Sequence, residues 1–500
     1  MPIDAVEQSD ICVVGTGPAA FAFLKALRRL GSDVSLVFLE AATGACPPFT
    51  ALEPSKSDLS VSRRSRNYVV DGQDAFSGEL DGWIARTKSD YLTESRVRAV
   101  GGTGNAWTGW ICSYLPSDQT TYAFGDWPIP YAALASHYGN VMEALDLPAD
   151  LLDPEVREVH ASMSQLPLRS LEREGWSEAH ALVAPFDFRK SFLETIAKDD
   201  RARLLTDATV VRLETRSTSG GGVVQECVVR SGKNIEIADR IVRAQIFVLA
   251  NGALEAPRLM LGSGFGTFLP QLGKNFIEHP YLWDGGKVQI DSARRKIPTQ
   301  FSPLLTRLTP TLGLIPFIVR AQRPNQDHLP VRLAIGGLGQ NPGTINASWE
   351  TARSVTAYVT LSEDCETDRW GQRRLKLASG SDDVLRLPEA ASSIESFARV
   401  LRDICGAESV TVANLESTLV LSPAPHRIAP GNHPAGTCRM SQNSNEGVVD
   451  VNCRVHSTTN LYIVGSAVFP SLGYANPTLS ILALADRLAA HLTSKLRVGS

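Results

Sequence analysis

The sequence predicts an α/β fold, in which a doubly wound parallel sheet is joined by a second domain with a mixed sheet. An apolar strand, a glycine-rich turn, a helix and another strand follow one another over residues 11–40, and a second strand–turn–helix unit covers residues 246–261. Residues 281–425 contain short strands and one helix instead. The alternating units favour a parallel sheet, whereas the middle region is typical of an α+β layer.

The first unit has the pattern of a phosphate-binding turn. Ile11–Val14 is a short apolar run with the length and branched side chains of a buried parallel strand. Gly15 then permits a tight turn, Gly17 lets a pyrophosphate approach the backbone, and Ala20 keeps the following helix close to the strand. The phosphates are expected at the positive N-terminal end of that helix.

The second strand of this unit ends in an acidic residue. Val34–Leu39 is apolar, and Glu40 follows it about twenty residues after the glycine turn, where an acidic side chain typically binds a ribose hydroxyl. The stretch therefore predicts a dinucleotide site and leaves open which dinucleotide binds.

Composition narrows the class of protein. The 500 residues are 43% hydrophobic, enough for a large core and two domains, and the net charge of −4 gives no general case for nucleic acid or an anionic membrane. No apolar run reaches the roughly 20 residues of a membrane span, and the N-terminus lacks a secretory pattern. Eight cysteines without a CxxC pair argue against a redox-active disulfide and a structural zinc site. We expect a cytoplasmic enzyme.

Two segments after the first unit allow alternative interpretations. Thr43–Leu92 is polar and contains the basic cluster Arg63–Arg66, which favours a solvated surface over a lid or an assembly surface. Val100–Trp110 is rich in glycine and ends in two tryptophans, as in a turn with packed indoles or a second cofactor loop. In the latter case its amides and Asn105 face a phosphate or a ring. An amphipathic helix is expected over Tyr131–Leu147.

The middle of the chain returns to regular elements. A helix is expected around Phe192–Ala197, a strand over Ala208–Leu213 and a hairpin tip at Gly220–Gly222. The apolar strand Ile246–Ala250 leads into Asn251-Gly252-Ala253 and a helix over Leu254–Leu261, and His279, before a proline, is interpreted as a packed turn residue.

Residues 281–425 are predicted to wall a pocket. The expected elements are three strands and a helix, at Leu314–Val319, Val331–Leu338, Val355–Leu361 and Ala390–Cys405. Pro316 makes the first of these an edge strand at best, because proline cannot donate to a sheet.

The C-terminal part carries the most specific motifs. Asn432–Met440, Asn460–Pro470 and Gly473–Ser480 are followed by a long helix. In these motifs the chain resembles the glucose–methanol–choline (GMC) oxidoreductases, FAD-dependent alcohol and sugar oxidases and dehydrogenases. The similarity extends to earlier segments, namely Gly15–Glu40, Gly101–Trp107, Gly125–Pro130, Leu249–Leu259 and Gly273–Pro280. The ending Ala475–Leu479 is most similar to the pyranose-oxidase and sugar-dehydrogenase branch.

The resemblance implies roles for individual residues. His433 takes the place of the base that removes the hydroxyl proton, and Asn476 that of its partner; a histidine suits this task near neutral pH. The implied FAD contacts lie in both glycine loops, at Glu40, on two strands and at the C-terminal motifs: Gly15, Gly17, Pro18, Ala19, Ala20, Glu40, Gly102, Thr103, Asn105, Ala106, Trp107, Val210, Asn251, Gly252, Gly465, Ser466, Pro477 and Thr478.

Two of these positions have alternative interpretations. Asn476 precedes Pro477 and could cap the last helix instead. Val210 is either a backbone contact to adenine or a plain core valine. Ala106 stands where some relatives attach FAD through a histidine, so non-covalent FAD is expected. No metal ligands are predicted, and Asn251 stands where the family more often has a small residue.

The resemblance also implies a discontinuous, Rossmann-like FAD-binding domain of the GMC and p-hydroxybenzoate-hydroxylase kind. Its parts are expected at 1–125, 179–280 and 426–500, the last carrying the catalytic residues. Residues 126–178 form a helical connection to the substrate side, and residues 281–425 form the interleaved α+β mixed-sheet substrate domain.

The leading functional hypothesis is oxidation of an alcohol on a sugar, glycoside or aminoglycoside-like substrate to a carbonyl, with hydride transfer to flavin N5 and a possible place in natural-product biosynthesis. The alternative is a GMC-fold lyase, similar to hydroxynitrile lyases, that binds FAD without redox turnover. A non-catalytic flavin protein and a nicotinamide-dependent dehydrogenase are disfavoured, because they leave the C-terminal motifs without a purpose. The sequence does not decide whether oxygen or a quinone-type compound accepts the electrons. It also leaves the exact substrate and the oligomeric state open.

Overall fold

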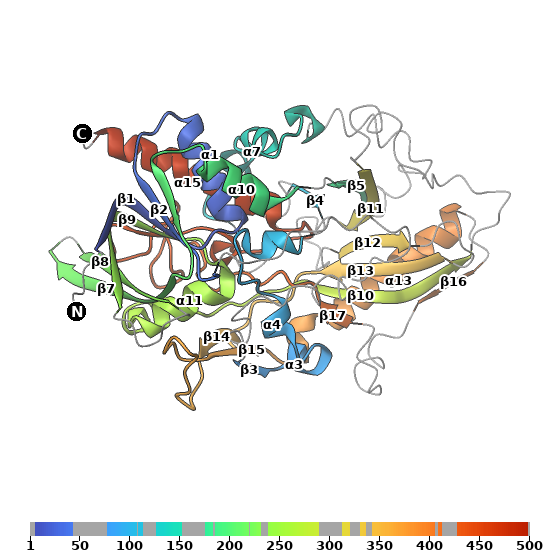
Figure 1. Ribbon diagram of the computed structural model, residues 1–500. Helices are drawn as coiled ribbons and strands as arrows, with labels where there is room; N and C mark the ends of the chain where they lie inside the picture. Colours follow the sequence, from blue (N-terminus) through green and yellow to red (C-terminus); the bar gives the residue numbers. More distant parts are fainter. Residues whose placement is uncertain are drawn as a thin grey trace.

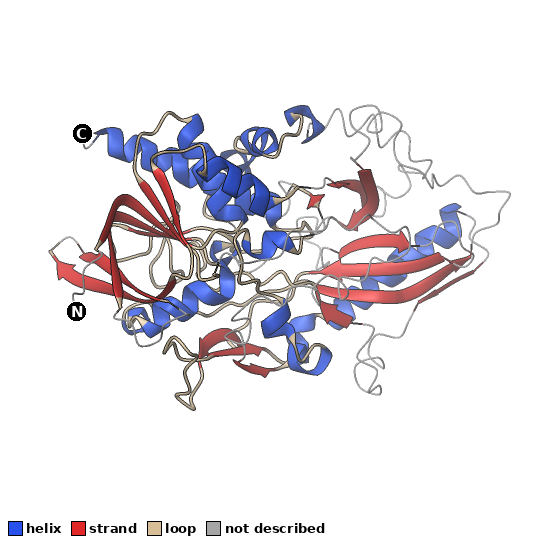
Figure 2. Cartoon of the chain, viewed as in Figure 1, coloured by secondary structure: helices blue, strands red, loops and turns tan. Residues whose placement is uncertain are grey.

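The computed structural model describes residues 6–43, 78–107, 109–113, 127–152, 176–183, 186–219, 221–231, 239–289, 313–320, 331–336, 343–405, 409–412 and 428–498. The basic cluster Arg63–Arg66 and the start of the Gly125–Pro130 motif lie outside these residues. Two large sheets lie side by side, with a small three-stranded sheet below them in the view of Figures 1 and 2.

The first sheet has seven strands in the order β6-β2-β1-β9-β8-β7, and β18 also pairs with β9. Its strands are β1 (Glu7–Val14), β2 (Leu36–Leu39), β6 (Ala202–Leu205), β7 (Thr209–Thr218), β8 (Gly221–Arg230), β9 (Arg240–Leu249) and β18 (Leu461–Ile463). Strands β6, β2, β1, β9 and β18 run parallel, whereas β7 and β8 form the expected hairpin. The predicted α/β fold with a parallel sheet is confirmed.

Strand β9 pairs with an antiparallel strand along one half and with a parallel strand from the end of the chain along the other. Its first half pairs antiparallel with β8, and its second half pairs parallel with β18. A strand from the last fifty residues thereby lies beside the middle of the chain, so both ends of the sequence build this sheet.

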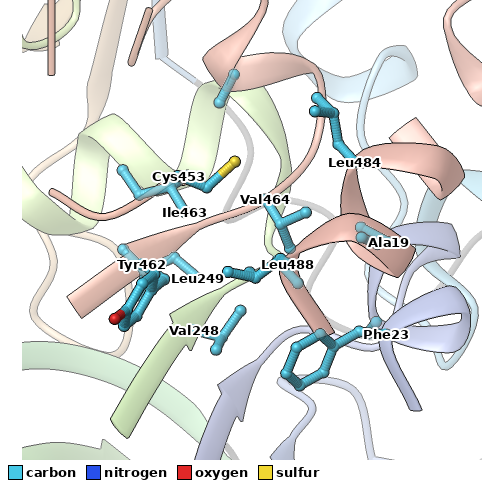
Figure 3. Close-up of a cluster of buried hydrophobic side chains, with 14 of the residues drawn as sticks. Ala19, Phe23, Val248, Leu249, Cys453, Tyr462, Ile463, Val464, Leu484 and Leu488 are labelled. Atoms are coloured by element: carbon cyan, nitrogen blue, oxygen red, sulfur yellow. The ribbon is translucent and has the colours of Figure 1, made fainter. Parts of the chain in front are cut away.

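Helices cover both faces of this sheet. Helices α1 (Pro18–Arg29), α10 (Phe188–Ile196) and α15 (Thr478–Val498) lie on one face, and α11 (Gly252–Gly262) lies on the other (Figure 1). Figure 3 shows apolar side chains of α1, β9, β18 and α15 packed together, among them Phe23, Val248, Ile463 and Leu488. These side chains are fully or almost fully buried, so apolar burial holds the two ends of the chain together.

The second sheet has eight strands in the order β16-β10-β13-β12-β11-β5-β4, and β17 also pairs with β10. The strands are β4 (Trp110–Ile111), β5 (Trp176–Val183), β10 (Pro280–Gln289), β11 (Gly313–Arg320), β12 (Val331–Gly336), β13 (Gly343–Trp349), β16 (Ser409–Val412) and β17 (Ile428–Pro430). Their pairings are antiparallel. Helix α13 (Leu387–Cys405) covers one face, where the Phe397 ring lies 5.2 Å from that of Trp176.

Two sequence expectations for this sheet need correction. Strand β11 contains Pro316 and was expected at an edge, yet it lies between β5 and β12. The pairing with β12 starts only at Ile318, so no β12 bond depends on the amide hydrogen that Pro316 lacks. The expected domain boundary at residue 179 falls inside β5, all of which pairs with β11.

The third sheet joins distant segments. It consists of β3 (Gly78–Asp81), β14 (Ala357–Leu361) and β15 (Leu375–Ser379), with β15 parallel to β3. The short helices α3 (Trp83–Thr87) and α4 (Tyr91–Glu94) follow β3. They bring Trp83 and Tyr91 into the apolar cluster of the second sheet, together with Trp176 of β5 and Trp349 of β13.

The remaining elements are short: η2 (Gly102–Asn105), α6 (Tyr131–Ala135), α7 (Tyr138–Ala144), η3 (Ala149–Leu152), η4 (Phe265–Thr267), η6 (Asp382–Leu385) and η7 (Ser466–Val468). The single helix expected over 131–147 is therefore wrong. It breaks at His137, where the amide donates to Leu134 O in a tighter turn and Nδ1 lies 2.6 Å from Asp486 Oδ1 of α15.

In the part of the chain that the structure describes, no helix is both long and apolar enough to cross a bilayer. The same residues contain no group of three side chains arranged to hold a metal ion.

Candidate active site

The first glycine turn is closed on one side and open on the other. Gly15 has φ +96°, and a Cβ there would lie 2.9 Å from the carbonyl oxygen of Ala250 at the end of β9. At Gly17 the same added atom meets nothing within 4 Å. Gly15 thus lets two strand ends pass closely, whereas Gly17 faces open space at the start of α1. Pro18 begins α1, and Ala19 and Ala20 are buried behind it.

The second glycine loop touches the first. A Cβ on Gly102 would lie 3.2 Å from Gly17 Cα, and the amide of Gly101 donates to Thr16 Oγ1 over 3.3 Å. The structure thus brings the two predicted loops together. Within the second loop, Asn105 Nδ2 donates to the carbonyls of Val100 and Gly102, each over 2.9 Å. This side chain therefore braces the loop.

The end of the second loop is part exposed and part packed. Thr103 is exposed, and its carbonyl accepts from the amide of Ala106 over 3.0 Å. Trp107 Nε1 donates to Phe186 O, and its ring packs edge-on to Phe188 at 5.0 Å. Trp107 is thus a packed indole at the rim of the loop, and Ala106 beside it has only a methyl side chain.

Glu40 lies buried at the end of β2 with both carboxylate oxygens in use. Thr16 donates to one oxygen, and the amide of Ala42 donates to the other over 2.9 Å. Burial raises the pKa of Glu40, while the Thr16 bond and the charge of Arg98 act in the opposite direction. Val210 is also buried, and its strand lies nearby because Ala208 N donates to Glu40 O.

A third group of open positions follows β9 and β18. Gly252 and Gly465 have φ +82° and +129°, and a Cβ at either would meet nothing within 4 Å. Asn251 Oδ1 is buried, and no donor among the described residues reaches it. A buried oxygen without a donor is costly unless a ligand or water supplies one. The glycines 17, 252 and 465 and this oxygen therefore fit a large polar ligand such as a dinucleotide.

Ser466 and Thr478 are placed differently from these open positions. Ser466 Oγ donates to Pro434 O over 2.8 Å, and Ser466 O accepts from Gly436 N. It therefore fixes the segment that carries His433 against η7. Thr478 begins α15, and the carbonyl of Pro477 before it accepts from Ile481 N. The helix thus starts one residue later than the sequence predicts.

His433 follows β17 and faces a second histidine. Its Nδ1 lies 2.9 Å from Nδ1 of His279, and the two rings meet nearly at right angles. Nε2 of His279 lies 2.9 Å from the carbonyl oxygen of Gly473. The interpretation of His279 as a packed turn residue misses this pairing, although the residue is buried as expected.

A buried carboxyl group, that of Glu278, accepts hydrogen bonds from the backbone amides of both histidines. Glu278 Oε1 accepts from the amide of His279 over 2.7 Å and from that of His433 over 2.8 Å, and Tyr91 donates to Oε2. Burial raises the pKa of Glu278 to about 7. Sequence reasoning assigned no role to Glu278 or Tyr91.

Both rings favour the neutral form. Burial lowers the pKa of His279 to about 3 and, with the charges of His279 and Arg332, lowers the pKa of His433 well below its usual value. A histidine that stays unprotonated at neutral pH retains the lone pair that a general base needs.

Asn476 lies against a buried guanidinium of the second sheet. Arg332 on β12 donates from Nη1 to Asn476 Oδ1 over 2.6 Å, and from the other nitrogens to Ser348 Oγ and the Tyr281 hydroxyl. The Tyr281 ring lies 6.1 Å from that of His433. Tyr281 and Arg332 therefore link the two predicted catalytic residues.

The orientation of the Asn476 amide follows from this contact. Arginine only donates, so the oxygen of Asn476 faces Arg332 and the two Nδ2 hydrogens remain for another acceptor. The sequence offered a helix cap as the alternative role of that oxygen. Arg332 lies in β12, in the region that the sequence predicts only as the wall of a pocket. No local sequence pattern therefore indicates its contact with Asn476.

Comparisons with known proteins agree on one family. The GMC oxidoreductase family matches residues 184–281 and 353–485. A C-glycoside 3-oxidase of Microbacterium trichothecenolyticum is 22% identical over 98% of this chain and 97% of its own length. The 6'''-hydroxyparomomycin C oxidase of Streptomyces lividus is 25% identical over 97% and 92%. A crystal structure of pyridoxine 4-oxidase from Mesorbium loti aligns with a TM-score of 0.59, 17% identity and coverage of 96% and 98%.

Proposed function

The chain belongs to the GMC oxidoreductase family, and from this premise we propose that it oxidises an alcohol on a sugar, glycoside or aminoglycoside-like substrate to a carbonyl. It is an FAD-dependent oxidoreductase that acts on CH–OH donors. The two relatives aligned over nearly their whole length are oxidases of a C-glycoside and of an aminoglycoside, which supports this substrate class. Because both relatives are named as oxidases, they favour redox turnover over the lyase alternative.

Two observations carry the proposal. The pKa of His433 is lowered well below its usual value, and the Asn476 amide, linked to His433 through Tyr281 and Arg332, is oriented by Arg332. His433 takes the hydroxyl proton, because burial keeps its ring unprotonated at neutral pH. Asn476 donates from Nδ2 to the same substrate oxygen, because its own oxygen is held by Arg332. Together the two side chains hold the hydroxyl and accept its proton.

FAD supplies the hydride acceptor when it is bound, at N5 of the flavin. Glu40 would hold the adenosine ribose, and the glycines at 15, 17 and 102 would let the pyrophosphate reach the N-terminus of α1. Open space adjoins Gly252 and Gly465, and the buried oxygen of Asn251, which no donor among the described residues reaches, would accept a hydrogen bond from the bound group.

The central test replaces the base. His433→Ala is expected to lower turnover by roughly 10²–10⁴-fold while FAD stays bound, which is the range for a lost general base. The measurement is anaerobic flavin bleaching against a panel of sugars, glycosides, aminoglycosides and simple alcohols, followed by reoxidation with oxygen or a quinone. His456→Ala is the control, because Nε2 of His456 lies 3.1 Å from the carbonyl oxygen of Ser441, in a segment that holds none of the proposed site residues. An unchanged rate, or loss of flavin from the His433 variant, would contradict the assignment.

The flavin is proposed to be non-covalently bound. Ala106 occupies the position where a histidine attaches FAD in some relatives, and its side chain is a methyl group. Acid precipitation of the holoenzyme should therefore release all of the yellow colour into the supernatant. A yellow pellet after washing would show a covalent bond and refute this part of the proposal.

A further inference from the structure

The two ring nitrogens of His279 have different partners, which fixes where its hydrogen lies. Nε2 is 2.9 Å from the carbonyl oxygen of Gly473, and a carbonyl can only accept. Nε2 of His279 therefore carries the hydrogen. Because burial keeps this ring neutral, with a pKa of about 3, its Nδ1 carries a lone pair and no hydrogen.

The hydrogen position on His433 follows in turn. Nδ1 of His433 lies 2.9 Å from the bare Nδ1 of His279, so His433 must donate in this contact. A neutral His433 with its hydrogen on Nδ1 has its lone pair on Nε2. This is the nitrogen left to accept a proton from a substrate.

We propose that His279 is a positioning residue, which holds His433 in the tautomer and ring orientation that leave Nε2 as the base. The inference rests on the proposed function, in which His433 removes the hydroxyl proton. His279 contacts neither the substrate nor the proton in this scheme and acts only through His433.

The surroundings keep His279 in place from two directions. Its amide donates to Glu278 Oε1, the same oxygen that accepts from the amide of His433. On the other side, the amide of Gly473 donates to the buried carboxyl group of Glu350 over 2.9 Å. The acceptor of His279 Nε2 is thus itself anchored, and the chain of contacts runs from Glu350 through Gly473 and His279 to His433.

Each of two substitutions keeps one of the two side-chain hydrogen bonds of His279 and removes the other. In His279→Asn, the side-chain oxygen replaces the Nδ1 acceptor, whereas the bond to Gly473 is lost. In His279→Gln, the longer amide can donate to Gly473 O, but nothing accepts from His433 Nδ1. His456→Gln is the control, because Nε2 of His456 also lies near a backbone carbonyl, Ser441 O at 3.1 Å, away from the site.

The expected kinetics follow from the hydrogen bond that each variant keeps. His279→Gln should lower kcat by roughly 10²–10³-fold with little change in KM, since a base in the wrong tautomer can lose up to about 10⁴-fold. His279→Asn should stay within about tenfold of the unmodified enzyme, because the acceptor is retained. Equal activity of the Gln variant and the control, or a larger loss in Asn than in Gln, would overturn the proposal.

A spectroscopic measurement on the unmodified holoenzyme tests the tautomer without any folding risk. Nitrogen-15 NMR of histidine-labelled protein distinguishes a hydrogen on Nδ1 from one on Nε2, and the signals missing in His433→Ala identify His433. The proposal requires Nδ1–H in the unmodified enzyme and in His279→Asn, and Nε2–H in His279→Gln. An Nε2–H signal for His433 in the unmodified enzyme contradicts it. Full turnover by His433→Ala would instead refute the proposed function itself.

Discussion

At the scale of single residues, the buried carboxylate of Glu40 has hydrogen-bond partners in the protein and the capacity to accept more from a ligand. Its carboxylate oxygens accept from Thr16 and from the backbone of Ala41 and Ala42, and a carboxylate has enough lone pairs to accept from a ribose hydroxyl as well. Burial raises its pKa, so additional donors from a ribose would favour the charged form.

We therefore predict that Glu40→Ala weakens FAD binding by roughly 10–100-fold, the loss expected for hydrogen bonds to a charged group. The measurement is fluorescence titration of the apoprotein with FAD. Asp10→Asn is the matched control, because Asp10 in the middle of β1 also accepts hydrogen bonds, from the amide and hydroxyl of Ser35 just before β2. Equal FAD affinity in the Glu40 variant and the control would remove Glu40 from the site.

Residue-scale prediction from sequence depends on local motifs, and the catalytic roles of the residues predicted in this way stay predictions. His433 and Asn476 lie in short recognisable motifs, and the structure brings them close through Tyr281 and Arg332. Arg332 could not be predicted, because its importance arises only when β12 meets the loop before α15. His279 gave a partial signal as a histidine before proline, but its partner lies 154 residues away.

At the scale of elements, the turn after β1 contains two glycines that serve different purposes. Gly15 has φ +96° and lies against the backbone of Ala250, whereas Gly17 has ordinary extended angles and open space around it. The first glycine is therefore required by the protein alone, and the second by whatever approaches the helix.

The same substitution at both positions tests this difference. Gly15→Ala should destabilise the apoprotein by about 1–3 kcal/mol, because it combines a strained φ with contact to a backbone oxygen. Gly17→Ala should leave apoprotein stability unchanged and weaken FAD binding, because its methyl group projects into the open space. Denaturant unfolding and FAD titration of both variants provide the measurement. Equal loss of stability in the two variants would contradict the assignment of separate roles.

Element prediction from sequence was accurate where periodicity is strong. The strand and helix of the first unit, the hairpin β7–β8 and helix α11 lie where the pattern predicts them, with boundaries shifted by a few residues. The helix expected over 131–147 failed, because His137 bonds Asp486 of α15, which is 349 residues away. The expectation that Pro316 places its strand at the edge of a sheet failed for a similar reason. The residue at which β12 starts to pair with β11 cannot be predicted from the sequence of β11 alone.

At the scale of the whole molecule, the candidate site lies where the two large sheets meet. The open glycines lie in turns that follow strands of the first sheet, whereas Arg332 and Tyr281 lie in strands of the second. His433 follows β17 and precedes Pro434, whose carbonyl accepts from Ser466. Buried carboxyl groups at this junction, Glu278 and Glu350, both have a pKa raised to about 7 by burial. The junction therefore couples stability to pH.

The sign of this coupling follows from the direction of the shift. A carboxyl group with a folded pKa near 7 and an unfolded value near 4.5 binds more protons in the folded state between these values. Its contribution to stability is complete below about pH 4.5 and is lost as the pH rises through 7. His279 acts in the opposite direction, because its lowered pKa makes the folded state lose stability as the pH falls below about 6.5.

Glu350→Gln isolates one of these contributions. The glutamine oxygen can still accept from the amide of Gly473, but the side chain no longer ionises. We predict that the variant and the unmodified holoenzyme melt at similar temperatures at pH 5, and that the variant melts at a higher temperature at pH 8. The effects of His279 and Glu278 are common to both proteins and cancel in the difference. A difference in Tm that stays constant from pH 5 to pH 8 would show that Glu350 does not titrate in this range and that the junction tolerates its charge.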